Sequence, residues 1–591
     1  MTVRVLDIET DGLLDDVTKM HCAVLYDIIG DGYEAFTDIA ELCKRLDTVD
    51  RLIGHNLCQY DLMVLEKLVG YRYKGDVGDT LILSRLENPD RPGGHSLEAW
   101  ASSFGYAKVE NEDWSVYTEH MLHRCIVDTQ VTQKLWQYFE ENFLSNHSNE
   151  KAADLEFDVA RIIGYQELNG VAFDRPKAVT LVAYLNGLIE QTDLEILDMA
   201  PPQVKKVGTT VLKPYKMNGE LSARAIKYAS EGAVVRGSFD AISILPLSQS
   251  SHKQMKDWFL SIGWKPDVWN YKEDPATGDK VRSSPKLEGD SLTLLPRGIG
   301  GKYTERLTQA HRRSQIEGWI GRIRYDGRIT AGCNTIGTNT NRFRHRGVVN
   351  VPKATDKVFL GKEMRSLFTV PKRKRLVGHD ASQLELRLFA AFVDDPEYVA
   401  QVLDGDIHTY NQNLAGLATR DEAKTFIYAL LYGAGDAKIG SIVGGGKREG
   451  AKVRKKFLDG LPGYDALVKK IKKQAKRGYL DGLDGRKIWM RRDDSGRIMD
   501  HKSLNTYIQS AGAIVMKKSM VLLSNQVELN KLDVIKVLDM HDEAQAEVSI
   551  KDADAYGELA VQSIRDAGSY YNLECPLDAE YKVGLNWSDT H

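Results

Sequence analysis

The stretch VRVLDIETDG at residues 3–12 runs a strand-forming sequence directly into a cluster of acids. Asp7 and Glu9 are two residues apart, so on a strand both side chains point to the same face while Ile8 points to the core. Two carboxylates on one face repel each other unless a cation neutralises them. The stretch therefore predicts a buried strand that carries a cation site. Asp11 is predicted as a turn residue and not as a ligand.

Two later segments supply further acids. Asp61 opens an amphipathic helix in NLCQYDLMVLEKL, and Asp128 flanks the apolar stripe of a second helix in HRCIVDTQVTQKLW. Together with Asp7 and Glu9 they would form an oxygen-ligand cage of the kind that Mg²⁺ or Mn²⁺ prefers. Pairs of such ions are used to attack phosphodiesters. For Asp61 alone, a helix N-cap is an equally good interpretation.

A second set of acids lies in the C-terminal half. RLVGHDASQLELRLFAAF predicts a strand ending at Asp380 and a helix opening at Ser382, where Ser382 and Glu385 would form a capping box. VIKVLDMHDEAQAEV predicts two strands joined at a hairpin tip, HDE, at residues 541–543. Aspartates at the ends of separate strands again predict a metal pair that binds phosphate oxygens.

Between these acids, TRDEAKTFIYALLYGAG predicts one helix. Arg420, Lys424, Tyr428 and Tyr432 recur every four residues and so lie along one face. Two cations followed by two aromatic rings could hold a triphosphate at one end and stack on a base at the other. An amphipathic core helix is the alternative, and it would explain the tyrosines but not the cations.

The length of 591 residues is too great for one core and predicts about three or four domains. The first 145 residues alternate strand-like and helical runs, which is typical of an α/β domain. Residues 200–300 are rich in turns and least informative. GRIRYDGRITAG predicts a hairpin through Asp-Gly.

The chain has no apolar run long enough to span a membrane, no export leader, and six Cys without CxxC spacing. These features predict a cytoplasmic protein. The net charge of −4 argues against a nucleic-acid binder when taken alone. However, basic clusters recur at NRFRHR, PKRKR and KKIKKQAKR, and a polyanion is contacted at many points along its length.

These motifs together resemble the DNA polymerase I family (family A), most closely the replicative polymerases of short-tailed bacteriophages. The resemblance rests on the order of acid strand, R-x-x-x-K helix and H-D-E hairpin, and it covers the chain except about 200–300. It implies a multi-domain α/β and α+β fold, in which a ribonuclease H-like 3′-5′ exonuclease precedes a right-hand polymerase. The implied domains are the exonuclease at 1–148, the thumb at 149–330, the palm at 331–404, the fingers at 405–484 and the palm again at 485–591.

The resemblance also implies the roles of the polymerase residues. Asp380 and Asp542 would hold two catalytic Mg²⁺ ions, with Ala381 as a further ligand, Glu543 beside them and Mn²⁺ as an alternative metal. Lys424 would be the general acid for pyrophosphate. The nucleotide-binding side chains would be His408, Arg420, Lys424, Tyr428, Tyr432 and Glu385.

Two of these residues would select the nucleotide. Glu385 would pair with Tyr428 and crowd a ribose 2′-hydroxyl, a role compatible with capping. Tyr at position 428, where Phe is the alternative, implies tolerance of dideoxynucleotides. The implied DNA-binding residues are Arg342, Asn505, Gln509 and His541, of which Gln509 and His541 would read minor-groove acceptors common to every correct pair.

For the exonuclease, the resemblance implies Asp7, Glu9, Asp61 and Asp128 as metal ligands, again two ions per site. One departure concerns the residue that orients the attacking water. Family relatives usually carry Tyr four residues before the last Asp, where this chain has Arg124. His123 has the spacing of the superfamily's histidine branch and is predicted as a general base. A weakened exonuclease and a surface histidine are the alternatives.

The predicted function is template-directed DNA synthesis with 3′-5′ proofreading, acting on primer–template DNA and dNTPs. The expected form is a monomer that meets a helicase or primase at the replication fork. Phage members can carry a long thumb insertion for a host processivity factor. Residues 200–240 are too short for one, so no such partner is expected. The alternatives are a polymerase with impaired proofreading, a single-subunit RNA polymerase and a non-catalytic nucleic-acid clamp.

Overall fold

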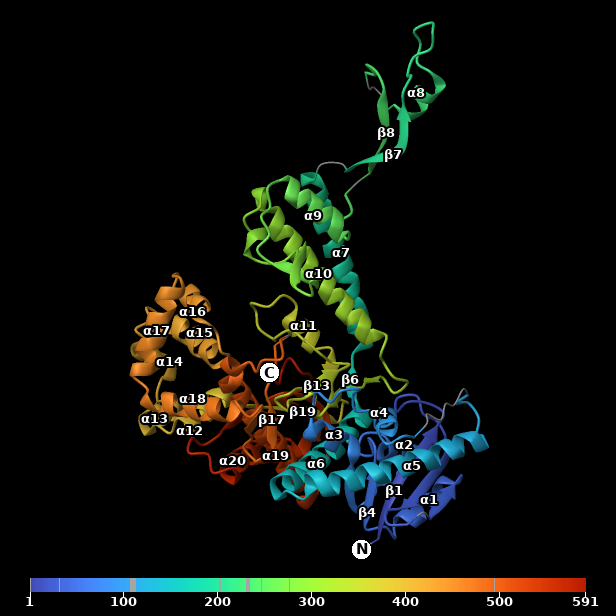
Figure 1. Ribbon diagram of the computed structural model, residues 1–591, viewed down its shortest axis with the longest axis vertical. Coiled ribbons are helices and arrows are strands. Elements are labelled where there is room, and N and C mark those ends of the chain that lie inside the picture. Colours follow the sequence, from blue (N-terminus) through green and yellow to red (C-terminus); the bar gives the residue numbers. More distant parts are fainter. Residues whose placement is uncertain are drawn as a thin grey trace. The chain divides into compact units, whose positions relative to one another are not determined.

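The computed structural model describes residues 2–30, 32–106, 113–200, 203–229, 234–245, 247–275, 277–493 and 495–591, with only the backbone described at 203–206 and 243–245 (Figure 1). The chain divides into two compact units. The larger comprises Met1–Asp174 and Arg322–His591, and the smaller comprises Arg175–Gly321. The smaller unit lies within the predicted thumb, 149–330, and the rest of that range belongs to the larger unit. Helix α6 (His147–Asn169) packs against helices of the larger unit, which accounts for the difference.

The N-terminal module of the larger unit is an α/β fold, as predicted. Its sheet has the order β3-β2-β1-β4-β5, with β1 antiparallel to β2 and parallel to β4. The strands are β1 (Val3–Thr10), β2 (Met20–Asp27), β3 (Tyr33–Phe36), β4 (Arg51–Gly54) and β5 (Asp76–Asp79). The helices are α1 (Ile39–Leu46), α2 (Asp61–Val69), α3 (Thr80–Glu87), α4 (Leu97–Ser103) and α5 (Glu119–Phe139).

The central strand β1 brings the acids of this module together. Val5, Leu6 and Ile8 are buried, so the strand is fixed in the core and its acidic side chains cannot swing away. Helix α5 packs along β1 and β2, and helix α2 also contacts β1. The two helices that carry the later acids therefore both lie against the strand that carries the first two.

The larger unit contains a second, antiparallel sheet of order β18-β19-β15-β20, which is called the palm sheet below because the resemblance implies the palm there. Its strands are β15 (Lys374–Ala381), β18 (Val534–Met540), β19 (Glu543–Ser549) and β20 (Ala579–Gly584). Helices α12 (Leu384–Val393), α19 (Ser503–Leu529) and α20 (Ala553–Tyr570) accompany it. The predicted strand at Asp380 and the predicted hairpin after Met540 are both present.

The predicted capping box at the start of α12 is wrong. The helix begins at Leu384, and the residue before it, Gln383, has a left-handed backbone with φ of 53° and makes no side-chain cap. The Ser382 amide instead donates to the carbonyl of Asp578, at 2.9 Å. Glu385 is therefore free of a capping role.

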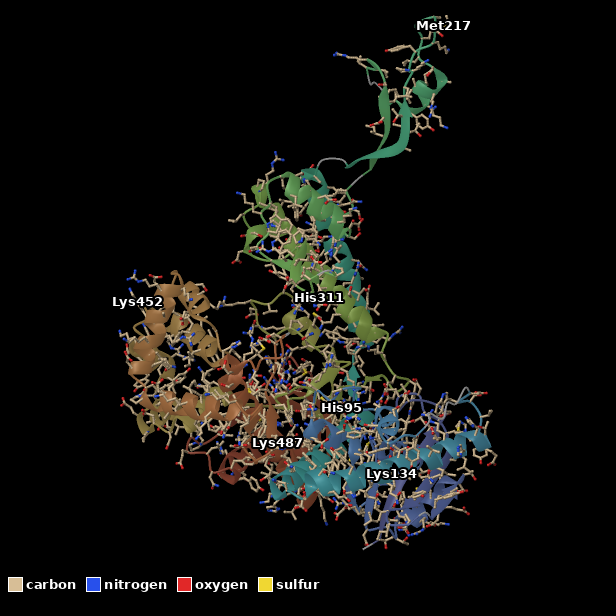
Figure 2. The ribbon with its side chains drawn as sticks, viewed as in Figure 1. His95, Lys134, Met217, His311, Lys452 and Lys487 are labelled. Carbon is tan, nitrogen blue, oxygen red and sulfur yellow. The ribbon has the colours of Figure 1, made fainter. Side chains whose placement is uncertain are left out.

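Helices α13 to α18, the segment where the resemblance implies the fingers and called the fingers below, form a helical group coloured orange in Figure 1. The helices are α13 (Pro396–Leu403), α14 (Ile407–Ala415), α15 (Arg420–Leu431), α16 (Asp436–Ile442), α17 (Lys447–Asp459) and α18 (Pro462–Ala475), followed by the hairpin of β16 (Tyr479–Asp481) and β17 (Lys487–Trp489). Lys452 of α17 is exposed, as expected for a basic surface, and Figure 2 marks it together with Lys487 on β17.

Short strands connect these parts of the larger unit. They are β6 (Val171–Phe173), β11 (Arg328–Ile329), β12 (Gly332–Asn334), β13 (Arg344–Arg346) and β14 (Phe368–Thr369), with helix α11 (Gly361–Arg365) between the last two. The predicted Asp-Gly hairpin forms only at its tip. Gly327 has a φ of 78°, and the Arg324 amide donates to the carbonyl of Arg328 at 2.8 Å. Beyond the tip, β11 pairs with β6.

The smaller unit contains helices and paired strands, including within residues 200–300, the stretch that is rich in turns in the sequence. Helices α7 (Arg175–Met199) and α10 (Ile299–Ile320) pack side by side, and α9 (His252–Ser261) adds Trp258 and Phe259 to their core. Strands β7 (Gln203–Val211) and β8 (Phe239–Leu245) pair with α8 (Ala223–Tyr228) between them, and β9 (Trp269–Glu273) pairs with β10 (Lys280–Pro285). Among all described residues, no helix combines the length and apolarity needed to cross a bilayer.

Candidate active sites

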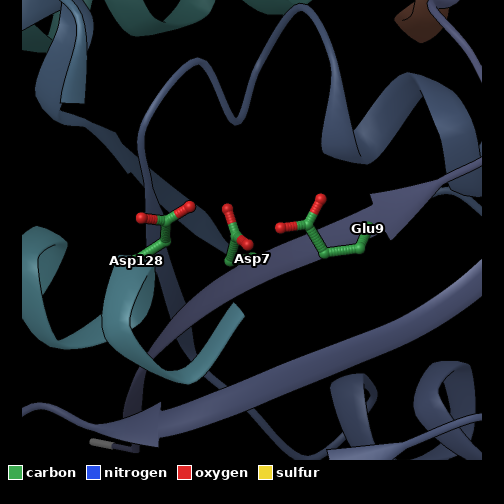
Figure 3. A group of neighbouring side chains, drawn as sticks. All are labelled: Asp7, Glu9 and Asp128. Carbon is green, nitrogen blue, oxygen red and sulfur yellow. The ribbon is translucent and has the colours of Figure 1, made fainter. Parts of the chain in front are cut away.

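The first acid cluster lies on β1 and α5. Carboxylate oxygens of Asp7, Glu9 and Asp128 all lie within 4.8 Å of one another, and Figure 3 shows the three side chains facing a common space. Asp61 adjoins them through β1, because its Oδ1 accepts a hydrogen bond from the Ile8 amide at 3.1 Å. The structure thus brings together all four acids predicted from three separate segments.

The four acids are held as a group that favours protons or cations. Burial, then the Glu9 and Asp128 carboxylates, raise the pKa of Asp7 well above its usual range. Burial raises the pKa of Glu9 to about 8, although Arg124 acts in the opposite direction. Burial also raises the pKa values of Asp61 and Asp128. Such a site gains stability when a divalent cation replaces the protons.

The structure distinguishes the alternative roles of Asp61 and Asp11. Helix α2 has Tyr60 as its N-cap residue, without a side-chain cap, so Asp61 is not an N-cap. Asp11 accepts hydrogen bonds from the amides of Thr18 and Lys19 at 2.9 Å and 3.0 Å, and it belongs to a loop as predicted.

His123 is not brought to the acid cluster. It is exposed on α5 and makes no recorded hydrogen bond or ion pair with the acids among the described residues. Arg124 is there instead, with its Nε at 3.2 Å from Glu9 and 3.5 Å from Asp128. Helical geometry explains the exchange, since a residue four before Asp128 shares its face and a residue five before does not.

The second acid cluster lies at one edge of the palm sheet. Asp380 stands at the end of β15 and pairs in register with Glu543, the first residue of β19. Asp542 lies in the turn between β18 and β19, and its carbonyl accepts a hydrogen bond from the Ala381 amide at 3.1 Å. Partial burial, then the Asp542 and Glu543 carboxylates, raise the pKa of Asp380 to about 7. Asp380 and Asp542 are thus adjacent and repel each other.

Glu543 differs from these two aspartates because the protein already supplies its partners. Its carboxylate contacts Arg365 at 3.3 Å, His591 Nδ1 at 3.1 Å and the indole nitrogen of Trp587. Burial opposes its ionisation, but His591 and Arg365 outweigh burial and lower the pKa of Glu543 to about 2. These three partners were missed from the sequence, where no local pattern connects them to the hairpin.

The fingers helix α15 presents the predicted cations and aromatic rings. Thr419 and Glu422 form a capping box at its start. The His408 ring, from α14, lies 6.5 Å from the Tyr428 ring, centroid to centroid. Burial, then the charges of Arg420 and Lys424, lower the pKa of His408. Four of the six predicted nucleotide-binding side chains are therefore close together. Arg420 is meanwhile paired with Asp406, with 2.8 Å between Nε and Oδ2.

Glu385 connects the fingers to the palm through a different tyrosine from the one predicted. Its Oε2 accepts a hydrogen bond from the Tyr432 hydroxyl at 2.8 Å, so the predicted pairing with Tyr428 is wrong in this structure. One helical turn separates the two tyrosines, and Tyr432 is the C-cap residue of α15, nearer to α12. Arg342 lies 3.9 Å from the other oxygen of Glu385.

A pocket beside the palm acids collects three of the four predicted DNA-binding residues. Arg342, Gln509 and His541 line it together with Glu385 and Asp542. His541 has a left-handed backbone with φ of 68°, and its ring centroid lies 4.8 Å from that of His345. The fourth residue, Asn505, lies one turn before Gln509 on α19 and is not among the residues that line the pocket.

Comparisons with known proteins agree with this geometry. The model of "DNA polymerase family A" matches residues 301–589. The DNA-directed DNA polymerase of Escherichia phage Phieco32 is 30% identical over 607 residues, covering 74% of this chain and 98% of that protein. That of Escherichia phage T7 is 27% identical over 716 residues, covering 99% of this chain and 100% of that protein.

A solved structure extends the likeness to the whole fold. The POL domain of Pol1 from M. smegmatis, in complex with DNA primer-template and dNTP, matches with a TM-score of 0.78 at 17% identity, over 99% of this chain and 96% of that one. The fold and the sequence relatives together define the class as DNA-directed DNA polymerases. The chain belongs to DNA polymerase family A, and its relatives include phage enzymes, as the motifs predicted.

Proposed function

We propose that this chain copies phage DNA from a primer–template and dNTPs, and that it removes misincorporated nucleotides through an attached 3′-5′ exonuclease. The observation that carries the proposal is the pair of separate carboxylate clusters, one on β1 with α5 and one on the palm sheet. The proposal is also supported by the cationic and aromatic helix α15, whose Tyr428 lies within electrostatic range of Asp542.

Both clusters fit divalent cations, because each gathers carboxylates that repel one another in the absence of a cation. Asp380 and Asp542, with Ala381 beside them, would hold two Mg²⁺ ions in the palm, and Asp7, Glu9, Asp61 and Asp128 would hold the exonuclease pair. When bound, these ions would lower the pKa of the attacking hydroxyl or water and neutralise phosphate charge.

In nucleotidyl transfer, the chain's own side chains orient the triphosphate. Arg420, Lys424 and His408 would bind its phosphate oxygens, and Tyr428 would stack beside the sugar and base. The primer 3′-oxygen then forms a bond to the α-phosphorus as the bond to pyrophosphate breaks. Lys424 would donate a proton to that leaving group.

Selection for deoxynucleotides is assigned to Glu385. Its hydrogen bond to Tyr432 holds the carboxylate beside α15, where it would exclude a ribose 2′-hydroxyl. This arrangement favours a DNA polymerase over a single-subunit RNA polymerase. A decayed, non-catalytic clamp is disfavoured because all six predicted carboxylate ligands are present.

One assay tests both activities. A labelled primer with a mismatched 3′ end is incubated with Mg²⁺ and all four dNTPs, and excision and extension are followed in time. Asp542→Ala should abolish extension and leave excision, and Asp7→Ala should do the reverse. Normal extension by Asp542→Ala would refute the palm assignment, and unchanged excision by Asp7→Ala would refute the exonuclease.

The same assay addresses the residue that activates the water. His123→Ala is compared with Arg124→Ala, since only Arg124 contacts the acids. Loss of excision in His123→Ala alone would support a histidine base that moves toward the acids on substrate binding. Full excision by His123→Ala would exclude it.

A further inference from the structure

A fully buried cluster of four charged side chains lies in the larger unit, apart from both acid sites. Glu156 comes from α6, Lys517 from α19, and Asp484 and Arg486 from the turn between β16 and β17. The side chains of Glu156, Lys517 and Arg486 are at most 2% exposed and that of Asp484 is 8% exposed. Two cations and two anions balance, so the cluster has no net charge.

The contacts within the cluster join three parts of the chain. Lys517 Nζ lies 2.7 Å from each oxygen of Glu156. Arg486 donates from Nη1 to the same carboxylate and from Nε to both oxygens of Asp484, at 3.0 Å and 2.8 Å. Glu156 is therefore shared between two cations, and its position depends on both of them.

Burying such a cluster costs several kcal/mol per ion before pairing offsets the loss, so it contributes little to stability. Buried ionic groups can instead specify one arrangement of the elements they join. The segment that this cluster positions is residues 341–343, which lie between Arg486 and Lys517.

Both cations contact this segment. Arg486 Nη1 donates to the side-chain oxygen of Asn341 at 3.2 Å, and Lys517 Nζ lies 5.4 Å from the centre of the Phe343 ring. Asn341 has a left-handed backbone, with φ of 57°, and is 3% exposed. Arg342, between the two contacts, extends into the pocket that Gln509 and Asp542 also line.

We propose that Glu156, Arg486 and Lys517 are positioning residues that hold Arg342 in register with α19, and thereby align the primer end with the palm acids. The proposal rests on the proposed polymerase function. Lys517 acts from the helix that also carries Gln509, so the same network fixes two residues that face the bound duplex. The cluster itself contacts neither DNA nor nucleotide.

Asn341→Gly tests the link without stranding a buried charge. Glycine adopts the left-handed backbone readily, and only the amide that accepts from Arg486 is lost. Asn572→Gly is the matched control, because Asn572 is exposed and also left-handed, with φ of 53°. Loss of a hydrogen bond from a charged donor should raise the KM for primer–template about tenfold in Asn341→Gly.

Three readouts separate positioning from a general structural role. Asn341→Gly should retain the wild-type KM for dNTP and the wild-type rate of excision, while extension of mismatched ends rises relative to matched ends. The Asn572→Gly control should behave as wild type throughout. An unchanged KM for primer–template in Asn341→Gly, or a parallel fall in the rate of excision, would overturn the proposal.

The double variant Glu156→Gln with Lys517→Met removes one anion and one cation, so it leaves no unbalanced charge in the core. It should reproduce the raised KM for primer–template, and a wild-type KM in this variant would also overturn the proposal. Should it fail to fold, Asn341→Gly still decides the question. A wild-type protein that extends no primer would instead refute the proposed function.

Discussion

The pH dependence of stability gives a direct test of the acid cluster on β1. In the metal-free protein the pKa of Glu9 is about 8, against an ordinary value of 4.5. The folded protein therefore keeps a proton on Glu9 in a range where the unfolded chain has lost it, so stability falls as the pH rises through that range. Between pH 6 and pH 8, this one group costs about 2 kcal/mol of the free energy of unfolding.

The measurement is urea unfolding at pH 6 and pH 8, in EDTA, for the wild type and for Glu9→Gln. Glutamine has nearly the same shape but does not ionise, so the wild type should lose about 2 kcal/mol more than the variant over this interval. Adding Mg²⁺ at pH 8 should restore stability to the wild type, because metal binding replaces the protons, and should restore less to the variant.

The comparison refutes the reasoning if the two proteins lose equal stability between pH 6 and pH 8. Glu9 would then ionise freely in the folded state, and the repulsion that demands a cation would be absent. If Mg²⁺ stabilised both proteins equally, Glu9 would not be a ligand of the metal.

The polymerase site has its own expected outcomes. Tyr428→Phe should lower the incorporation of dideoxynucleotides relative to dNTPs by about tenfold or more in a chain-termination assay, and an unchanged ratio would contradict the role of its hydroxyl. Tyr432→Phe frees Glu385 from its hydrogen bond and should raise rNTP incorporation several-fold in a competition assay, with equal discrimination as the contrary result. Because the pKa of Asp380 is about 7, the apparent Mg²⁺ affinity in primer extension should fall about tenfold per pH unit below pH 7 and level off above it, whereas a flat profile would contradict the ligand assignment.

The elements that carry the acids were predictable because their signals are local. The period-two alternation around Asp7 and Glu9 predicts a strand without any knowledge of the strands that pair with it. The hairpin around Asp542 is predicted from two apolar runs that are adjacent in the sequence. The capping residues Thr419 and Glu422 likewise stand within one helical turn of each other. In such cases the residues that decide the structure are neighbours in the chain.

The failures have a common physical origin in long-range packing. Ser382 and Glu385 have the capping-box spacing, but the Ser382 amide is committed to Asp578, almost two hundred residues later. Arg124 also contacts Glu9 because α5 packs on β1, a contact that spacing within the helix does not reveal. Arg486 and Glu156 are 330 residues apart, and no sequence pattern pairs them.

Two glutamates illustrate how the surroundings of a carboxyl group decide its role. Glu9 faces other acids and its pKa rises to about 8, whereas Glu543 is surrounded by Arg365, His591 and Trp587 and its pKa falls to about 2. A divalent cation adds little stabilisation to a carboxylate whose charge is already neutralised by protein groups. It adds much to a carboxyl group that stays protonated because no cation is present. We therefore assign Glu9 as a metal ligand and Glu543 as an anchor that holds the first residue of β19, and with it the position of Asp542.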